Sequence, residues 1–475
     1  MTPILLALLL AAPAAPQAPT PSDPVATAIA RAAPGTRIGL MVVDETGREI
    51  VAVRPDERFV PASNTKIFTT AAAFATLDMT APDGGGGAEV RLEGRDVVLS
   101  GHGDARLSSA ADCRSDCLAD LARAVAARTR IVHDVIGDDS ALPDERWPQG
   151  MSWNNQVGRY GTAISALTID DNVVALSVTP GAAGAPPAIT GDGYYELENR
   201  ATTVAGGKTA LEETRQPGSH VLRIGGTIAA GAPARTVLVG IDDPAHRAAW
   251  RLAQILRAEG VRVTGTVSVR HRPPSPSDDP DQRGGAPAPH APAPPAALAR
   301  LAPPPLGEDV RHTNKVSQNL HAELLLRRVG ATTGSGSVAD GRAVVVRMLG
   351  GIGIPRWQYE FADGSGMSSY NRVTPRATVT LLRWIAAQPW GAAWRATLPV
   401  GGVDGTLASR FHATPLDGRL FAKTGSLNAT SAVSGYLTAA SGHVLTFAAF
   451  ANDVPGDASA TAAIDQALLA VAASH

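Results

Sequence analysis

The chain has 475 residues, of which 44% are hydrophobic and 18% are charged. This length suffices for about three domains of ordinary size with large cores. Lys and Arg number 42 and Asp and Glu number 44, so the formal net charge is −2. The composition is that of an ordinary globular protein, and the lack of a basic excess argues against a nucleic acid partner.

The first 18 residues are mostly apolar and contain the triplet Ala12-Pro13-Ala14. A short apolar run with such a small-residue site is typical of a secretory signal peptide. The run is too short to span a membrane comfortably and too rich in Pro for a buried helix. We therefore expect residues 1–18 to direct export. No later segment has about 18 uninterrupted apolar residues, so the mature chain is predicted to lack an integral membrane segment.

Strand and helix patterns recur at both ends of the chain. Residues 23–33 predict a helix, and an Ala- and Leu-rich helix is expected from about residue 458. Five runs are rich in β-forming residues, at positions 38–43, 49–53, 419–423, 432–438 and 443–450. The two ends resemble halves of one antiparallel sheet with flanking helices, which makes the middle of the chain a candidate insertion.

The middle of the chain divides into two parts by composition. Residues 84–270 alternate short strands and turns with helical stretches, and their opening run of glycines lacks the spacing of a phosphate-binding loop. Residues 271–305 are rich in Pro and predict an exposed, polyproline-like or disordered loop. We therefore expect one domain to be split between residues 19–83 and 306–475.

The two cysteines, Cys113 and Cys117, are too few for a disulfide framework. Their spacing, without a second Cys or His pair, does not make a structural zinc site. They either bridge locally or stay free, and a small local feature is favoured over a redox site.

The first motif with chemical meaning is Ser63-Asn-Thr-Lys66, which precedes an apolar helical stretch. Residues three apart on a helix are neighbours, so Ser63 and Lys66 are expected side by side. Burial and the positive end of the helix dipole would lower the pKa of Lys66, and a neutral amine can take the proton of the serine hydroxyl. Taken alone, so short a pattern more often marks a helix-capping Ser and a surface Lys.

Two further motifs lie in the C-terminal part. Ser317-Gln318-Asn319 opens a strongly apolar helix, which could press a hydroxyl and an amide against the Ser63 helix. Lys423-Thr424-Gly425 lies on a predicted strand, followed by Ser426. Gly425 would let a ligand backbone approach that strand, and Lys423 and Thr424 offer a cation and a hydroxyl to a carboxylate. An ordinary edge strand with a surface Lys is the alternative for the third motif.

The three motifs occur together in the order found in β-lactamases and penicillin-binding proteins. Lysine occurs only four times in the chain, and Lys66 and Lys423 fall on motif positions. The long segment between Ser63 and Ser317 is too large for a compact β-lactamase. The chain resembles the class C low-molecular-mass penicillin-binding proteins, the D-alanyl-D-alanine carboxypeptidase/endopeptidase family. Segments such as Asp363-Gly-Ser-Gly366 and Leu398–Leu407 are similar to family signatures.

This resemblance implies an α+β fold with a β-lactamase/transpeptidase-like catalytic domain, an antiparallel sheet flanked by helices, that is split by inserted β-rich domains. It implies an exported enzyme of the periplasm or cell envelope that acts on peptidoglycan stem peptides through an acyl-enzyme. β-Lactams would be covalent inhibitors. No cofactor and no metal are expected.

The resemblance also assigns roles to the motif residues. Ser63, Lys66, Ser317, Asn319 and Lys423 are implied to be catalytic. Those implied to bind substrate are Thr424, Gly425, Ser426, Asp170 and Asp171, where either Asp would meet a cationic diamino-acid side chain. For the Asp pair, a turn or capping role is an equal alternative. For the whole chain, the alternatives are a serine β-lactamase or esterase and a catalytically silent cell-wall-binding scaffold.

Overall fold

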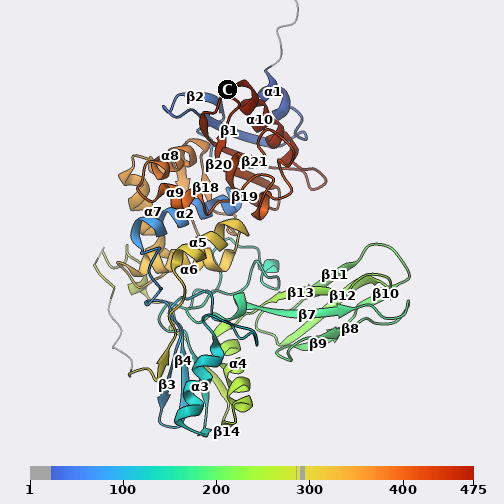
Figure 1. The fold of residues 1–475 in the computed structure, drawn as a ribbon, viewed down its shortest axis with the longest axis vertical. Helices are drawn as coiled ribbons and strands as arrows, with labels where there is room; N and C mark the ends of the chain where they lie inside the picture. Colours follow the sequence, from blue (N-terminus) through green and yellow to red (C-terminus); the bar gives the residue numbers. More distant parts are fainter. Residues whose placement is uncertain (1–22, 285, 289–294) are drawn as a thin grey trace, which may run out of the picture.

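The computed structural model describes residues 23–284, 286–288 and 295–475 (Figure 1), and the predicted signal peptide at 1–18 lies outside these ranges. A five-stranded antiparallel sheet joins the two ends of the chain, in the order β19-β20-β21-β1-β2. These strands are β1 (Arg37–Val43), β2 (Glu49–Val53), β19 (Leu420–Leu427), β20 (Thr430–Thr438) and β21 (Val444–Asn452). The predicted split sheet is therefore present.

Strand β1 separates two hydrophobic cores, because successive side chains of a strand point to opposite faces. Met41 and Val43 pack into one core, and Leu40 and Val42 pack into the other. The second core is closed by α1 (Pro24–Ile29) and α10 (Thr461–Ser474), which pack together. The first core is covered by α2 (Thr65–Thr76), α5 (Leu306–Lys315), α6 (Asn319–Ala331), α7 (Val338–Gly351), α8 (Pro375–Ala386) and α9 (Gly391–Arg395).

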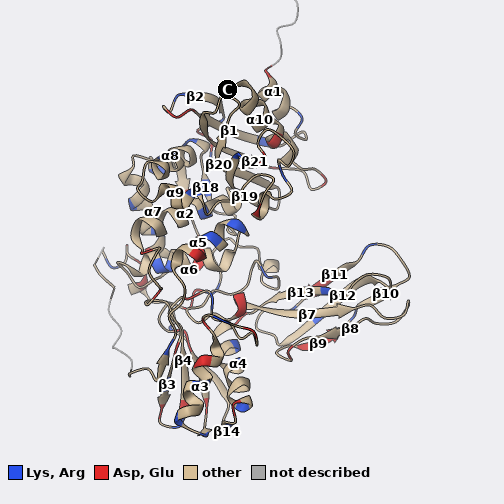
Figure 2. Ribbon diagram, in the orientation of Figure 1, with Lys and Arg blue, Asp and Glu red and all other residues tan. Residues whose placement is uncertain are grey.

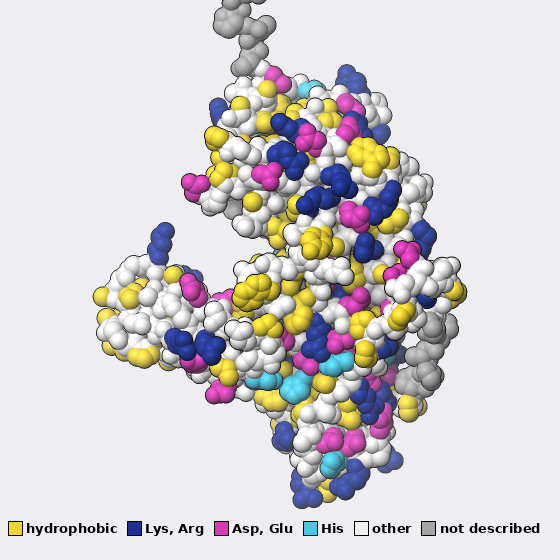
Figure 3. Space-filling model, turned by 180° about the vertical axis from the view of Figure 1, so that it is seen from behind, with side chains coloured by type: hydrophobic (Ala, Val, Ile, Leu, Met, Phe, Trp, Pro, Cys, Tyr) yellow, Lys and Arg dark blue, Asp and Glu magenta, His cyan; other side chains and the backbone are white. Residues whose placement is uncertain are grey.

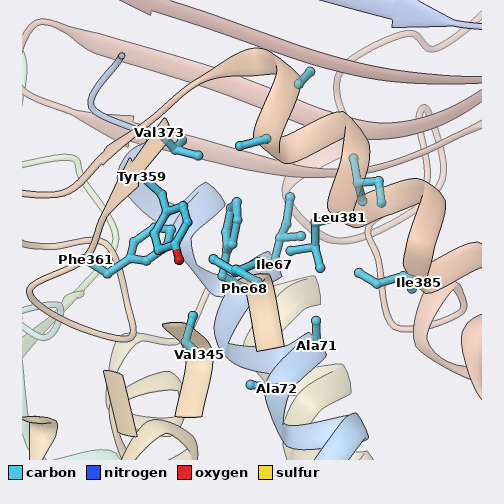
Figure 4. Packing of buried hydrophobic residues seen from close by; sticks show 14 of the residues in the cluster. Ile67, Phe68, Ala71, Ala72, Val345, Tyr359, Phe361, Val373, Leu381 and Ile385 are labelled. Atoms are coloured by element: carbon cyan, nitrogen blue, oxygen red, sulfur yellow. The ribbon is translucent and has the colours of Figure 1, made fainter. Parts of the chain in front are cut away.

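Helix α2 runs through the middle of the first core (Figure 4). Its residues Thr65 through Ala73 are all buried, so the helix has no solvent-facing stripe in that stretch. Phe68 packs against Phe361 with ring centroids 4.7 Å apart. A helix that is buried all round is typical of the centre of a large domain. Any polar side chain on this stretch is therefore removed from water.

The insertion contains a second five-stranded sheet, in the order β15-β6-β4-β3-β16 (Figure 1). Its strands are β3 (Glu89–Glu93), β4 (Asp96–Ser100), β6 (Val135–Asp138), β15 (Val267–Arg270) and β16 (Ala299–Arg300). Helices α3 (Leu118–Arg128) and α4 (Pro244–Ala258) share a core with this sheet. The short strands β5 (Ile131–Val132) and β14 (Arg262–Val263) pair beside it.

Two smaller sheets form an arm that projects from the insertion (Figure 1), and Figure 3 shows it as a lobe beside a hollow in the surface. One sheet pairs β7 (Val173–Thr179) with β8 (Ala188–Thr190) and β13 (Arg235–Gly240). The other is built on β12 (Val221–Ala229), which pairs with β9 (Glu196–Asn199), β10 (Thr202–Val204) and β11 (Ala210–Thr214). The arm has its own small core around Tyr194 and Tyr195.

The Pro-rich segment, in its described parts at 271–284, 286–288 and 295–305, makes more fixed contacts than its composition predicts. Its last part contributes β16, which pairs with β3. Its first part is fixed to the catalytic part of the chain by an ion pair between Arg283 and Asp340 on α7, with side chains 7% and 3% exposed. A buried charge has to be paired, and this pairing holds the segment where Pro prevents a regular ladder.

The two cysteines, for which the sequence left bridged and free forms open, form a disulfide with a Cα–Cα distance of 5.7 Å. Basic and acidic residues are interspersed along the described chain (Figure 2). Among the helices of residues 23–284, 286–288 and 295–475, none has both the length and the apolar character needed to cross a membrane.

We expect Phe68→Ala to lower the stability of the catalytic part by about 3–5 kcal/mol, because Phe68 is 1% exposed and its removal leaves a cavity between α2 and Phe361. The thermal unfolding midpoint measures this change. Trp357→Ala serves as the control, because Trp357 is 54% exposed. An equal shift in both variants would contradict the packing described here.

Candidate active site

Ser63 lies in a short 3-10 turn, η1 (Ala62–Asn64), that leads directly into α2. One turn along, Lys66 Nζ is 2.9 Å from Ser63 Oγ, as the sequence spacing predicts. Lys66 Nζ also donates to Asn319 Oδ1 at 2.6 Å and to the Ser365 carbonyl at 2.6 Å. The amide and carbonyl oxygens can only accept hydrogen bonds. A neutral amine therefore gives its two hydrogens to these oxygens and keeps its lone pair for the Ser63 hydroxyl.

Burial lowers the pKa of Lys66 to about 7, while the nearby carboxylates of Asp363 and Glu323 raise it. Lys66 is fully buried, so its ammonium form loses the hydration that stabilises it in water. The two carboxylates hold the pKa near neutrality and prevent a larger fall. A serine next to an amine with such a pKa has a base available at neutral pH.

Sequence reasoning missed the carboxylate of Glu323, and it quoted Asp363 within a family signature without giving it a role. Glu323 on α6 accepts from the Gly364 and Ser365 backbone N–H groups at 3.1 and 2.9 Å, and it pairs with Arg327 at 3.1 Å. Burial and the charge of Glu323 raise the pKa of Asp363 to about 6. Glu323 lies one helical turn after Asn319, and that spacing within an apolar stretch was the available signal.

Ser317 lies between α5 and α6 in the left-handed backbone region, with φ of 63°. Its Oγ is 2.9 Å from Lys423 Nζ, which also donates to the Thr424 carbonyl at 2.8 Å. Burial lowers the pKa of Lys423 well below its usual value, and the charge of Lys66 adds to this effect. The site therefore contains two serine–lysine pairs, Ser63 with Lys66 and Ser317 with Lys423.

Strand β19 places Lys423, Thr424 and Gly425 beside the Ser63 turn. Asn64 Nδ2 donates to the Lys423 carbonyl at 3.1 Å. A Cβ at Gly425 would lie 2.7 Å from the Pro61 carbonyl oxygen and 3.1 Å from the Ser63 nitrogen. The sequence predicted that Gly425 admits a ligand backbone, but here its missing side chain admits the Ser63 turn itself.

These residues surround a cleft of about 1240 Å³. Of the predicted site residues, those that line it are Ser63, Ser317, Asn319, Thr424, Gly425 and Ser426. Lys66 and Lys423 are fully buried next to it and reach the cleft through the two serines. Tyr160 and Met151 from the insertion also line the cleft, and the sequence gave no local motif that would have singled them out.

The structure does not bring Asp170 and Asp171 into this cleft. Both line a separate cavity, where Asp170 accepts from Ser109 and Asp171 is 3.0 Å from His321 Nε2. Their 3-10 turn, η3 (Asp170–Asn172), has positive φ at every residue, which is a conformation that Asp and Asn adopt more readily than most residues. The substrate-binding role predicted for these two acidic residues is therefore wrong, because they lie in this turn and outside the cleft.

Groups of His and acidic side chains with metal-ligand spacing, as far as the described residues show, lie outside the cleft. The cleft instead holds a serine hydroxyl beside a buried amine, a second serine–lysine pair and a strand edge. This arrangement can carry out acyl transfer through a serine ester. With the antiparallel sheet and its helices, it defines a serine hydrolase or acyltransferase of the β-lactamase/transpeptidase class.

The chain belongs to the D-Ala-D-Ala carboxypeptidase 3 (S13) family, whose model matches residues 23–280 and 281–474. It is 34% identical over 441 residues to a D-alanyl-D-alanine carboxypeptidase of Actinomadura sp. (strain R39), covering 86% of this chain and 77% of the relative. It is 29% identical over 451 residues to carboxypeptidase DacB of Mycolicibacterium smegmatis, covering 92% and 82%. The family expected from the motifs is confirmed.

The fold is similar to that of penicillin binding protein 4 from Haemophilus influenzae, with a TM-score of 0.77 and 20% sequence identity. The alignment covers 93% of this chain and 97% of that structure. The predicted fold class, a catalytic domain split by an insertion, is therefore confirmed.

We expect Gly425→Ala to destabilise the protein by about 1–3 kcal/mol, because the new methyl group would push the Ser63 turn away from β19. Thermal unfolding measures the loss. Gly350→Ala is the matched control, because a Cβ at Gly350 meets no atom within 4 Å and Ala favours the α7 helix. The prediction fails when Gly425→Ala is as stable as the parent protein.

Proposed function

We propose that the protein is a serine D-Ala-D-Ala carboxypeptidase and DD-endopeptidase that acts on peptidoglycan stem peptides through an acyl-enzyme on Ser63. β-Lactams would inhibit it by acylating the same hydroxyl. The observation that carries this proposal is the position of Lys66 Nζ, 2.9 Å from Ser63 Oγ, with the Asn319 and Ser365 oxygens at 2.6 Å placed to accept the hydrogens of a neutral amine. Family membership supports the substrate class.

In the acylation step, Ser63 Oγ attacks the carbonyl carbon between two D-alanines, and its proton passes to Lys66 Nζ. The C–N bond then breaks, and the leaving amine takes a proton. Ser317, which is 2.9 Å from Lys423, is placed to relay that proton. Lys66 passes the proton that it took from Ser63 to the leaving amine by way of Ser317, and so returns to its neutral form.

The negative charge on the attacked oxygen needs backbone donors close to Ser63. The N–H groups of Ser63 and Ser426 are assigned this role, because β19 runs directly beside the Ser63 turn. Each such donor is worth about 3–4 kcal/mol in comparable sites. Asn319 would hold the substrate amide, and its side chain is kept in place by Lys66 and by the Tyr160 carbonyl at 2.9 Å.

The terminal carboxylate of the substrate would bind at Thr424 and Ser426, near Lys423. Thr424 Oγ1 is 2.6 Å from Thr406 Oγ1, which orients its hydroxyl. A bound carboxylate next to Lys423 would raise the pKa of this buried amine and favour its charged form. Hydrolysis of the acyl-enzyme repeats the first step with water, whose proton would pass to Lys66.

The predicted export of the chain supports an action on peptidoglycan in the periplasm or cell envelope. The cleft measures about 1240 Å³ and extends to Tyr160 and Met151 of the insertion. A substrate larger than a dipeptide therefore has room, which fits a cross-linked stem peptide as well as a terminal one.

We expect penicillin to add one acyl group per chain, in a long-lived adduct that is absent in Ser63→Ala and present in Ser441→Ala. The control residue, Ser441, is exposed in the turn between β20 and β21 and does not line the cleft. Intact mass spectrometry, with a prolonged chase, measures the adduct. Assays on D-Ala-D-Ala peptides then measure the carboxypeptidase activity, and assays on cross-linked muropeptides measure the endopeptidase activity.

Other results would overturn the proposal in distinct ways. Turnover of penicillin without accumulation would indicate a serine β-lactamase or esterase. No reaction at all would indicate a catalytically silent cell-wall-binding scaffold. An adduct that persists in Ser63→Ala would place the nucleophile elsewhere.

The rate of acylation by a β-lactam is expected to rise about tenfold between pH 6 and pH 8 and then to level off. The base is the neutral form of Lys66, whose pKa is lowered by burial to about 7, so its population grows as the pH rises through that value. Stopped-flow measurement of acylation, corrected for hydrolysis of the β-lactam by hydroxide, gives the profile. A flat profile over this range would contradict the role of Lys66.

A further inference from the structure

A second cavity, of about 370 Å³, lies where the insertion meets the catalytic part of the chain. Its walls include Asp171 of η3, His312 of α5 and His321 of α6. His321 is 3% exposed, which is unusual for a titratable side chain. The proposed acyl transfer uses none of these residues.

The three side chains converge on one point. His321 Nε2 is 3.0 Å from Asp171 Oδ1, and one ligand atom from each of the three residues lies within 4.8 Å of the others. The His312 and His321 rings have centroids 4.9 Å apart. In a tetrahedral zinc site with bonds of about 2.0–2.2 Å, neighbouring ligand atoms are about 3.3 Å apart. The ligand atoms are therefore somewhat wider apart than in a loaded zinc site, and a bound ion would draw them together.

The surroundings of His321 are those of a metal-binding histidine. Its Nδ1 atom faces Asp309 Oδ1 at 3.3 Å, and Asp309 is in turn held by Arg106. A carboxylate on one ring nitrogen fixes the tautomer and leaves the other nitrogen free to bind a metal.

The cavity also carries more negative than positive charge. Asp116 and Asp170 line it beside Asp171. The carboxyl of Asp116, which is only 7% exposed, is hydrogen-bonded to the buried carboxyl of Asp104. Two acidic groups buried side by side are costly to ionise, and a cation in the cavity would offset that cost.

We propose that Asp171, His312 and His321 bind one divalent transition-metal ion, with zinc the best match to two imidazoles and a carboxylate. Three protein ligands leave a fourth position open to the cavity. The ion would join the insertion, through Asp171, to α5 and α6, the two helices that flank Ser317. It would therefore fix the position of the turn that carries the second motif.

Two other groups of His and Asp in the described chain fit a metal less well. The group of Asp139, Asp144 and His271 has a single imidazole, and the guanidinium of Arg146 lies 2.9 Å from His271 Nε2, where its positive charge opposes a metal ion. The group around His133 has a single imidazole, 52% exposed. Without a metal, His321 would instead be a charged imidazolium between Asp171 and Asp309, and the experiment distinguishes these two states.

The test uses the full mature protein, stripped of metal with a chelator, and the variants His312→Gln, Asp171→Asn and His133→Gln. Asp171 and His312 are partly exposed, so the fold should tolerate the two substitutions. Thermal unfolding of each variant in chelator checks that it is folded. Equilibrium dialysis measures zinc per chain at pH 7.5. Cobalt(II) supplies a second readout, because its visible absorption distinguishes tetrahedral from octahedral coordination.

We expect about one zinc per chain, a tetrahedral cobalt spectrum and a rise in Tm of about 2–4 °C with zinc. Zinc binding and the cobalt spectrum should be lost in His312→Gln and kept in His133→Gln. In Asp171→Asn the affinity for zinc should be at least tenfold weaker. Absence of binding to the parent protein would overturn the proposal in favour of the imidazolium. Binding that survives in His312→Gln, or is lost in His133→Gln, would place the metal elsewhere. Formation of the penicillin adduct on Ser63 is scored separately.

Discussion

The site depends on the removal of two lysine amines from water. Lys66 and Lys423 are both fully buried, and each reaches a serine hydroxyl at 2.9 Å. An ammonium in such a place is unfavourable, so burial produces the neutral amine that a serine nucleophile needs. This requirement explains why α2 is buried all round and why three distant segments have to meet around it. Glu323 and Asp363 limit the effect, because their charge keeps the pKa of Lys66 near neutrality.

Close approach of the backbone is the second constraint. Ser63 can lie against β19 only because Gly425 has no side chain. Gly366 also has to lack one, because a Cβ there would lie 1.9 Å from the Ala62 carbonyl oxygen. The Ser63 turn thus lies between β19 and the loop at residues 364–366, whose backbone N–H groups at Gly364 and Ser365 donate to Glu323. The precision of the site comes from this backbone packing as much as from the catalytic side chains.

Local patterns in the sequence were sufficient to predict the sheet that joins the two ends and the three motifs on their helix and strand. The strand run 38–43 lies within β1 and the run 443–450 overlaps β21, because a continuous apolar run reflects a strand buried on both faces. What depends on distant contacts could not be predicted. Glu323 meets the 364–365 backbone only in the folded chain, and Asp171 meets His321 instead of the cleft. The Pro-rich segment is fixed by Arg283 and Asp340, a pairing that composition does not reveal.

The pairing of β1 with β21 has a consequence for the order in which the chain folds. Arg37 pairs with Asn452, so the first strand of the catalytic sheet waits for one of the last segments to be synthesised. Strands β3, β4 and β6 of the insertion pair over much shorter separations. Contacts close in sequence form faster than distant ones. The insertion should therefore become structured while the chain is still emerging, and the serine–lysine pairs should assemble last, so that a truncated chain would be folded in part and inert.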